Sequence, residues 1–219
     1  MRIYLSTFAL NSLFLIFVFT VILLAKIFSP SVGGLFLPPP APQYWGESLL
    51  THAFQILCCI PPVVCTFSYF LLRTIQTHNK NNQFILFSAL LTTGFLINQF
   101  YRIHIILYYL NIPKLVTVFC GTLVAIYYGV TFRQQIKSTP YFLLFTALGL
   151  LFTAVYVDSL HLSGDSKPIL LEGVPKLFSS VNLSLYFWFV CYDELKKLIL
   201  VQTKSEFGLK LQECDRSRQ

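Results

Sequence analysis

The chain has 219 residues, of which 55% are hydrophobic, 16% aromatic and only 11% charged. About a quarter of the residues in a soluble domain are charged, so this composition excludes an ordinary water-soluble globule and a disordered tail. The 16 Lys and Arg residues outnumber the 9 Asp and Glu residues, which leaves a net charge of +7. Because these charges fall between long apolar runs and form no basic stripe, nucleic acid is not an expected partner.

Apolar stretches of membrane-crossing length recur along the chain. A transmembrane helix needs about 20 mostly apolar residues. Six stretches fit: 7–28, 53–73, 84–104, 115–132, 141–161 and 176–195. We therefore predict an all-α integral membrane protein, a six-helix bundle that forms a single transmembrane domain over residues 1–200. Residues 201–219 form a short polar tail, and membrane lipids are the expected partners.

Prolines mark two places between and within these spans. Residues 30–50 join the first two spans and contain Pro38-Pro39-Pro40-Ala41-Pro42, which favours a stiff, extended conformation outside the membrane. Within the second span, Pro61 and Pro62 remove backbone donors, so we expect a kink there. Five of the six cysteines lie in or beside apolar runs, which predicts small buried side chains and no disulfide framework.

The distribution of basic residues predicts the orientation. Membrane proteins concentrate Lys and Arg on the cytoplasmic side. Eleven fall on the side that holds both termini: Arg2, Arg73, Lys80, Arg133, Lys137, Lys196, Lys197, Lys204, Lys210, Arg216 and Arg218. Five fall on the other side: Lys26, Arg102, Lys114, Lys167 and Lys176. Both termini are therefore expected in the cytoplasm.

Two segments resemble each other at an offset of about 60 residues. The third span begins Leu-Phe-Ser-Ala-Leu and ends at His104, and the fifth begins Leu-Phe-Thr-Ala-Leu and ends at His161. The spans that follow open with Ile-Pro-Lys-Leu at Pro113 and with Val-Pro-Lys-Leu at Pro175. Proline suits the first turn of a helix. This similarity predicts a duplicated two-helix hairpin, with spans 3–4 as one copy and spans 5–6 as the other.

Polar residues collect at the non-cytoplasmic ends of spans 3, 5 and 6. Ionisable groups near hydrocarbon are costly, so they indicate partners or function. The predicted site consists of Asn98, Arg102, His104, Asp158, His161, Glu172 and Lys176. Spacings of three or four residues let Asn98 and Arg102, Asp158 and His161, and Glu172 and Lys176 share helix faces.

Three interpretations of this polar layer stay open. Salt bridges and hydrogen bonds between Arg102 and the carboxylates of Asp158 or Glu172 would hold the hairpins together. A metal could instead bind His104, Asp158, His161 and Glu172, since imidazole and carboxylate suit zinc, iron or manganese, although no diagnostic metal-binding spacing is present. A third possibility is a pocket for a lipid headgroup or small polar ligand, with Arg102 holding an anion.

The same region carries a family resemblance. The segments are Asn98-Gln99-Phe100-Tyr101-Arg102-Ile103-His104-Ile105, Asn111-Ile112-Pro113-Lys114, the single Asp158, and Leu171-Glu172-Gly173-Val174-Pro175-Lys176. Over roughly residues 84–195 the chain resembles a group of uncharacterised bacterial membrane proteins with about six spans. The resemblance implies a bacterial inner membrane and no particular activity. Where the group has an acidic pair and a His-Glu, this chain has Asn98-Gln99 and His104-Ile105, which weakens the metal interpretation.

The sequence thus predicts a multi-pass membrane protein with a structural or accessory role, or one that binds a lipid or small ligand. The alternative is a membrane-embedded, metal-dependent enzyme centred on His104, Asp158, His161 and Glu172. No cofactor is specified.

Overall fold

The computed structural model describes residues 2–28, 32–36, 48–75, 80–101, 103, 107, 113–160 and 167–216. These residues form seven α-helices and one 3₁₀ helix, and they contain no strand. The elements are α1 (Arg2–Phe28), η1 (Val32–Phe36), α2 (Leu49–Ile75), α3 (Lys80–Tyr101), α5 (Lys114–Thr131), α6 (Arg133–Lys137), α7 (Tyr141–Ser159) and α8 (Lys167–Arg216). The prediction of an all-helical protein is confirmed for this part of the chain.

Four of the described helices are long and apolar enough to cross a membrane. They contain Leu5–Phe28, Leu49–Ile75, Asn81–Tyr101 and Tyr141–Ser159, which correspond to the first, second, third and fifth expected spans. The fourth expected span is a shorter apolar helix, Val116–Thr131. The sixth lies within α8, where Ser179, Ser180, Asn182 and Ser184 interrupt the apolar sequence. That the chain crosses the membrane six times therefore remains a proposal.

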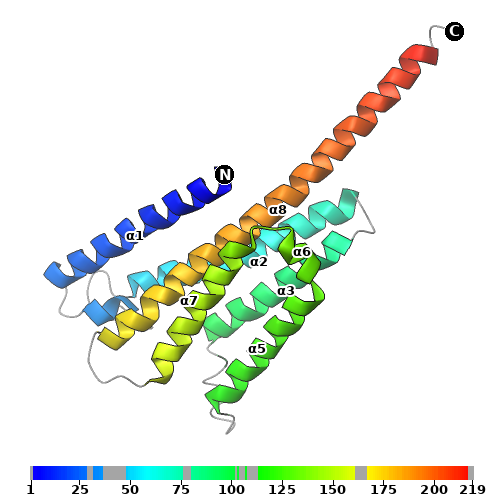
Figure 1. The fold of residues 1–219 in the computed structure, drawn as a ribbon. Coiled ribbons are helices and arrows are strands. Elements are labelled where there is room, and N and C mark those ends of the chain that lie inside the picture. Colours follow the sequence, from blue (N-terminus) through cyan, green and yellow to red (C-terminus); the bar gives the residue numbers. More distant parts are fainter. Residues whose placement is uncertain are drawn as a thin grey trace.

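Helix α8 is the central element of the bundle (Figure 1). It packs lengthwise against α7 and α2, and α3 packs on α2. Helix α1 contacts α8 and η1, while α5 meets α3 through the stacked rings of Phe84 and Tyr128 and through Phe132. Beyond the bundle, α8 continues as one helix to Arg216, so the expected tail extends the last helix.

Helices that follow one another along the chain alternate in direction, whereas α2 and α8 pack side by side and run parallel. Ser179 near the start of α8 bonds to Ala147 in α7, and Glu194 bonds to Asn81 at the start of α3. The bundle thus has two ends. We call them the η1 end, where α2, α5 and α8 begin, and the α6 end, where α3 and α7 begin and residue 195 of α8 lies.

The largest apolar cluster lies toward the α6 end and draws on five helices. Tyr186 and Phe187 of α8 are fully buried there, together with Phe84, Tyr128 and Leu143. A second cluster near the η1 end joins α1, η1, α2 and α8 through Val18, Ala25, Leu35, Leu50 and Leu177. Close packing in these two clusters holds the helices together, because van der Waals packing is a main source of helix association in membranes.

Part of the loop between α1 and α2 packs into the bundle. In η1, Gly33, Gly34 and Leu35 are buried, and the Ser48 amide donates to the Gly34 carbonyl at 2.9 Å. The structure therefore places η1 within the helical bundle, where its apolar Val-Gly-Gly-Leu-Phe docks on α2 and α8. The proline-rich segment 38–42 lies outside the described residues.

Of the prolines singled out in the sequence, Pro175 occupies a different position from the predicted one. Pro113 directly precedes α5, but Pro175 lies inside α8, which begins at Lys167. The first-turn assignment of Pro175 is therefore wrong. Pro61 and Pro62 lie within α2, which continues through both as one helix. In addition, α7 packs along α8, whereas α3 and α5 meet at the α6 end, so the duplication of the hairpin stays a prediction.

Candidate functional site

The predicted polar layer is described in part. Asn98 on α3, Asp158 on α7, and Glu172 and Lys176 on α8 lie toward the η1 end of their helices. Arg102, His104 and His161 lie outside the described residues. The interhelical pairing of Arg102 and the convergence of the two histidines therefore remain predictions.

Glu172 and Lys176 form an ion pair one turn apart on α8, with both side chains about one-third exposed. This contact is local to one helix and links no two spans. Because the ammonium group occupies an oxygen of Glu172, this carboxylate is less available as a metal ligand. Elsewhere among the described residues, no group of three His, Cys, Asp or Glu side chains could hold a metal ion.

Among the described residues, two buried polar side-chain atoms near the η1 end have no hydrogen-bond partner. They are the carboxamide oxygen of Asn98 in α3 and the hydroxyl oxygen of Thr117 in α5. A buried acceptor without a donor costs about 1–3 kcal/mol, so such an atom commonly marks the place of a water or ligand. Asn98 is the predicted site residue for which the structure provides a specific reason to expect a bound donor.

A row of small polar residues on α8 was not recognised from the sequence as a packing surface. The hydroxyl of Ser179 donates to the Ala147 carbonyl at 2.7 Å, and Ser184 Oγ lies 2.9 Å from the Leu57 carbonyl. The carboxamides of Asn11 and Asn182 bond to each other. Small and polar residues that stabilise contacts between helices are typical of membrane bundles. The concentration of such residues within 179–184 was the sequence signal from which this packing surface could have been predicted.

Hydroxyl and thiol groups are also paired at the core of the α6 end. Ser88 donates to its own helix at Phe84, so the Tyr128 hydroxyl is the donor in the 2.6 Å bond to Ser88. The Tyr186 hydroxyl reaches Thr139 in the same way at 3.0 Å. The sulfur atoms of Cys65 and Cys191 lie 3.9 Å apart. The Ser88–Tyr128 and Cys65–Cys191 contacts each join two helices, and the Tyr186–Thr139 contact joins α8 to the turn between α6 and α7.

The five described cysteines are free thiols: Cys58, Cys59, Cys65, Cys120 and Cys191.

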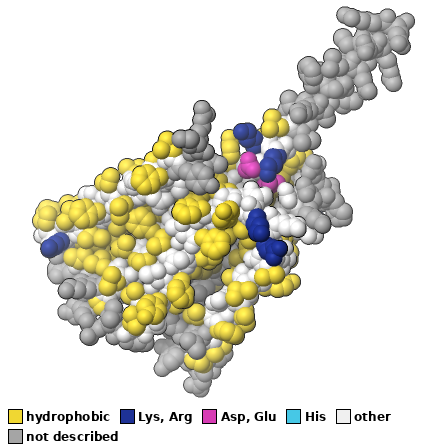
Figure 2. Space-filling view, in the orientation of Figure 1, with side chains coloured by type: hydrophobic (Ala, Val, Ile, Leu, Met, Phe, Trp, Pro, Cys, Tyr) yellow, Lys and Arg dark blue, Asp and Glu magenta, His cyan; other side chains and the backbone are white. Residues whose placement is uncertain are grey.

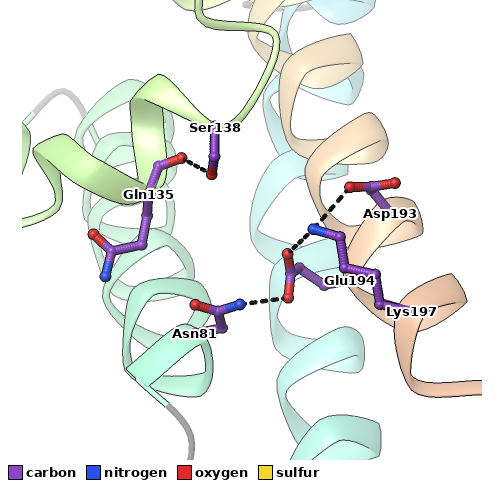
Figure 3. Close-up of polar contacts among 6 residues, drawn as sticks. All are labelled: Asn81, Gln135, Ser138, Asp193, Glu194 and Lys197. Atoms are coloured by element: carbon purple, nitrogen blue, oxygen red, sulfur yellow. Dashed lines mark hydrogen bonds and ion pairs between the residues drawn. The ribbon is translucent and has the colours of Figure 1, made fainter. Parts of the chain in front are cut away.

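A surface cluster forms where α8 leaves the bundle (Figure 3). The Glu194 side chain is only 16% exposed, accepts from Asn81 at 2.7 Å and pairs with Lys197 at 2.8 Å. Lys197 also pairs with Asp193 at 3.0 Å. The bond to Glu194 raises the pKa of Lys197, because it stabilises the ammonium form. These contacts tie α3 to α8.

An apolar groove of about 560 Å³ opens between α2 and α8. Its walls include Ile56, Ile60 and Val63 from α2 and Val181, Leu185 and Trp188 from α8. Ser184 is the single polar residue among the ten that line it. A smaller groove of about 460 Å³ lies between α2 and α3.

The exterior of the bundle is strongly apolar (Figure 2). Large exposed apolar residues cover α1, α2, α5 and α7, for example Phe8, Phe67, Val130 and Phe152, each at least 63% exposed. A water-soluble protein rarely exposes apolar surface on this scale. Together with the four helices of membrane-crossing length, this surface defines the class: an all-helical protein with the features of an integral membrane protein.

Within that class, the chain belongs to the family described as "Domain of unknown function (DUF8692)", which it matches over residues 8–191. Neither the curated proteins nor the solved structures contain a match.

Proposed function

We propose that the chain crosses the membrane six times, with both termini in the cytoplasm. Support comes from the alternating directions of the helices, because α5 and residues 176–195 of α8 run between the same two ends as the four long apolar helices. The polar residues of α8 are compatible with a span since they are buried and bonded within the bundle. The excess of basic residues at the α6 end supports its cytoplasmic location.

We propose further that this membrane protein binds a lipid acyl chain in the groove between α2 and α8. The observation that carries this proposal is the groove itself, with about 560 Å³ of space and a single polar residue in its lining. Pockets of 300–1,000 Å³ are the usual size for small ligands. At mid-span, the molecules that can enter from the side are lipid chains.

The chemistry of the groove favours an apolar occupant over a polar one. The hydroxyl of Ser184 already interacts with backbone carbonyls, Ser180 in its own helix and Leu57 in α2. A polar ligand would therefore lose its bonds to water without gaining equivalent bonds in the groove. Trp188 is 55% exposed at the margin and offers an apolar face to a chain.

Trp188 provides a direct test. The sequence contains two tryptophans, so replacement of Trp45 by Phe leaves Trp188 as the single emitter. In bilayers of acyl-brominated phosphatidylcholine, we expect strong quenching of Trp188, because a chain in the groove places bromine against the indole ring. Val63→Phe is the variant that fills the groove, and it should reduce the quenching of Trp188. Val63→Trp is avoided because it would add a second emitter.

Leu13→Phe on α1 is the matched control, since Leu13 is 65% exposed and lies outside the groove; it should leave the quenching curve unchanged. Equal quenching of Trp188 in all three proteins would overturn the acyl-chain proposal. No quenching by any acyl bromine would overturn the membrane placement as well.

The unpartnered oxygen of Asn98 favours a second candidate, a polar ligand or a metal at the η1 ends of α3, α7 and α8. In this alternative Asn98 would bond to the ligand, and His104, Asp158, His161 and Glu172 would complete a metal-dependent site. The test is elemental analysis of the purified protein together with the variant Asn98→Leu. Stoichiometric zinc, iron or manganese that disappears in the variant would support the enzyme alternative, and absence of all three metals would remove it.

A further inference from the structure

The charged side chains that the structure describes are arranged differently at the two ends of the bundle. At the α6 end, the described side chains include Arg73 at the end of α2, Arg133 and Lys137 on α6, and Lys196 and Lys197 on α8. In Figure 2, Lys and Arg side chains gather near the point where α8 leaves the bundle. At the η1 end, Lys176 is paired with Glu172, and Lys26 and Asp158 have opposite charge.

The carboxylates described at the α6 end are already engaged. Asp193 and Glu194 both pair with Lys197, and Glu194 also accepts from Asn81. Four basic side chains are exposed and form no ion pair with a described residue: Arg73, Arg133, Lys137 and Lys196. We call these four residues the basic surface. It has a net positive charge that the described part of the protein does not neutralise.

Helix α6 presents half of this surface in a fixed orientation. Phe132, directly before α6, is buried in the apolar cluster, and Ile136 packs against the same cluster. Arg133 and Lys137 are four residues apart, share a helix face, and are both exposed. The short helix is therefore anchored by its apolar residues and directs two cations outward, as an amphipathic helix at a membrane interface does.

We propose that the basic surface binds the phosphate groups of anionic phospholipids in the leaflet that surrounds the α6 end. Guanidinium groups bind phosphate in a bidentate manner, and ammonium groups add point charges. Basic residues next to a span attract anionic lipid, and the attraction weakens with added salt. This inference rests on the membrane placement proposed above, and it does not depend on the occupant of the α2–α8 groove.

The experiment uses the full chain in nanodiscs that contain phosphatidylglycerol and phosphatidylcholine in equal amounts, followed by native mass spectrometry of the lipids retained. We expect selective retention of phosphatidylglycerol by the unmodified protein, with a preference that falls as salt rises. Arg133→Gln and Lys137→Gln should each lower the preference about fivefold, and the double variant should lower it about thirtyfold, if each cation contributes its typical share.

The matched control is Lys26→Gln, which removes one cation at the η1 end and should leave the preference unchanged. Thermal unfolding in pure phosphatidylcholine checks that the variants are folded; any variant that fails this check is replaced by Lys196→Gln, which lies on a different helix. Equal retention of both lipids by the unmodified protein, or the same loss in Lys26→Gln as in the α6 variants, would overturn the proposal. If Trp188 is quenched by acyl bromines while lipid preference is absent, the headgroup proposal fails and the membrane placement survives.

Discussion

The carboxamides of Asn11 in α1 and Asn182 in α8 donate to each other, with nitrogen to oxygen distances of 3.2 and 3.1 Å. The remaining amide hydrogens are used as well, since Asn11 donates to Thr7 and Asn182 donates to Phe178. Asn182 is only 4% exposed. This pair, in the middle of two mostly apolar helices, fixes the position of α1 against α8.

Replacement of Asn182 by Leu should destabilise the protein, because the half-buried carboxamide of Asn11 would lose its partner. A double-mutant cycle with Asn11→Leu should give a coupling free energy of about 0.6–1.7 kcal/mol, the range for hydrogen bonds between membrane helices. Unfolding by SDS in mixed micelles measures it. The control is a cycle of Asn182→Leu with Thr20→Val, because Thr20 is an exposed α1 residue whose hydroxyl bonds within its own helix. A coupling free energy of similar size between Asn182 and Thr20 would contradict the pairing of Asn11 with Asn182.

A second prediction concerns two adjacent tyrosines in α5. Tyr128 is buried and bonds to Ser88, while Tyr127 is 71% exposed. Tyr128→Ala should cost about 3–5 kcal/mol, the usual cost of truncating a buried aromatic residue, because α5 is held at this end by Tyr128 and Phe132. Tyr127→Ala should change the free energy of unfolding by less than about 0.5 kcal/mol. Equal costs would show that α5 docks through another face.

A third prediction concerns the contact between η1 and α8. A Cβ atom built on Gly173 would overlap the ring of Phe36, whereas one built on Gly149 in α7 would meet nothing within 4 Å. Gly173→Ala should therefore destabilise the protein by about 1–3 kcal/mol through overpacking, and Phe36→Leu in the same chain should recover part of the loss. Gly149→Ala is the control and should be neutral or stabilising. Thermal unfolding in detergent compares the three proteins.

A fourth prediction tests the contact between α2 and α8. In a chain that retains only Cys65 and Cys191, oxidation by copper phenanthroline should join the two sulfur atoms, which lie 3.9 Å apart, within reach of a disulfide after a small rotation. Maleimide labelling after denaturation should then fall from two thiols to none. In the control chain that retains Cys65 and the exposed Cys120, both thiols should stay reactive.

Much of the fold follows from the sequence because membrane-crossing length is a strong signal. Residues 7–28 and 53–73 fall inside helices as expected. The first residue of α8 could not be predicted from the sequence. Pro175 is typical of a helix start, but residues 167–174 are already helical, and this segment packs against η1. The packing role of Asn182 was also hidden, because a single Asn in an apolar run does not reveal its partner in the distant α1.

The candidate site follows less well from the sequence. Residue types and helical spacing place Glu172 beside Lys176, and the structure contains that ion pair. Spacing along one helix carries no information about the distance between helices, so the convergence of Arg102 with Asp158 stays a prediction. The α2–α8 groove arises from the shapes of side chains on two helices, and no local pattern encodes it.

The most direct test of the account is the sidedness of three positions in a cysteine-free chain reconstituted in sealed vesicles. Single cysteines replace Lys26, Lys137 and Asp158, and a membrane-impermeant maleimide reports which face each one occupies. The account predicts that Lys26→Cys and Asp158→Cys react from one face and Lys137→Cys from the opposite face. Reaction of Lys137→Cys and Asp158→Cys from the same face would mean that α7 does not cross the bilayer and would contradict the six-span topology.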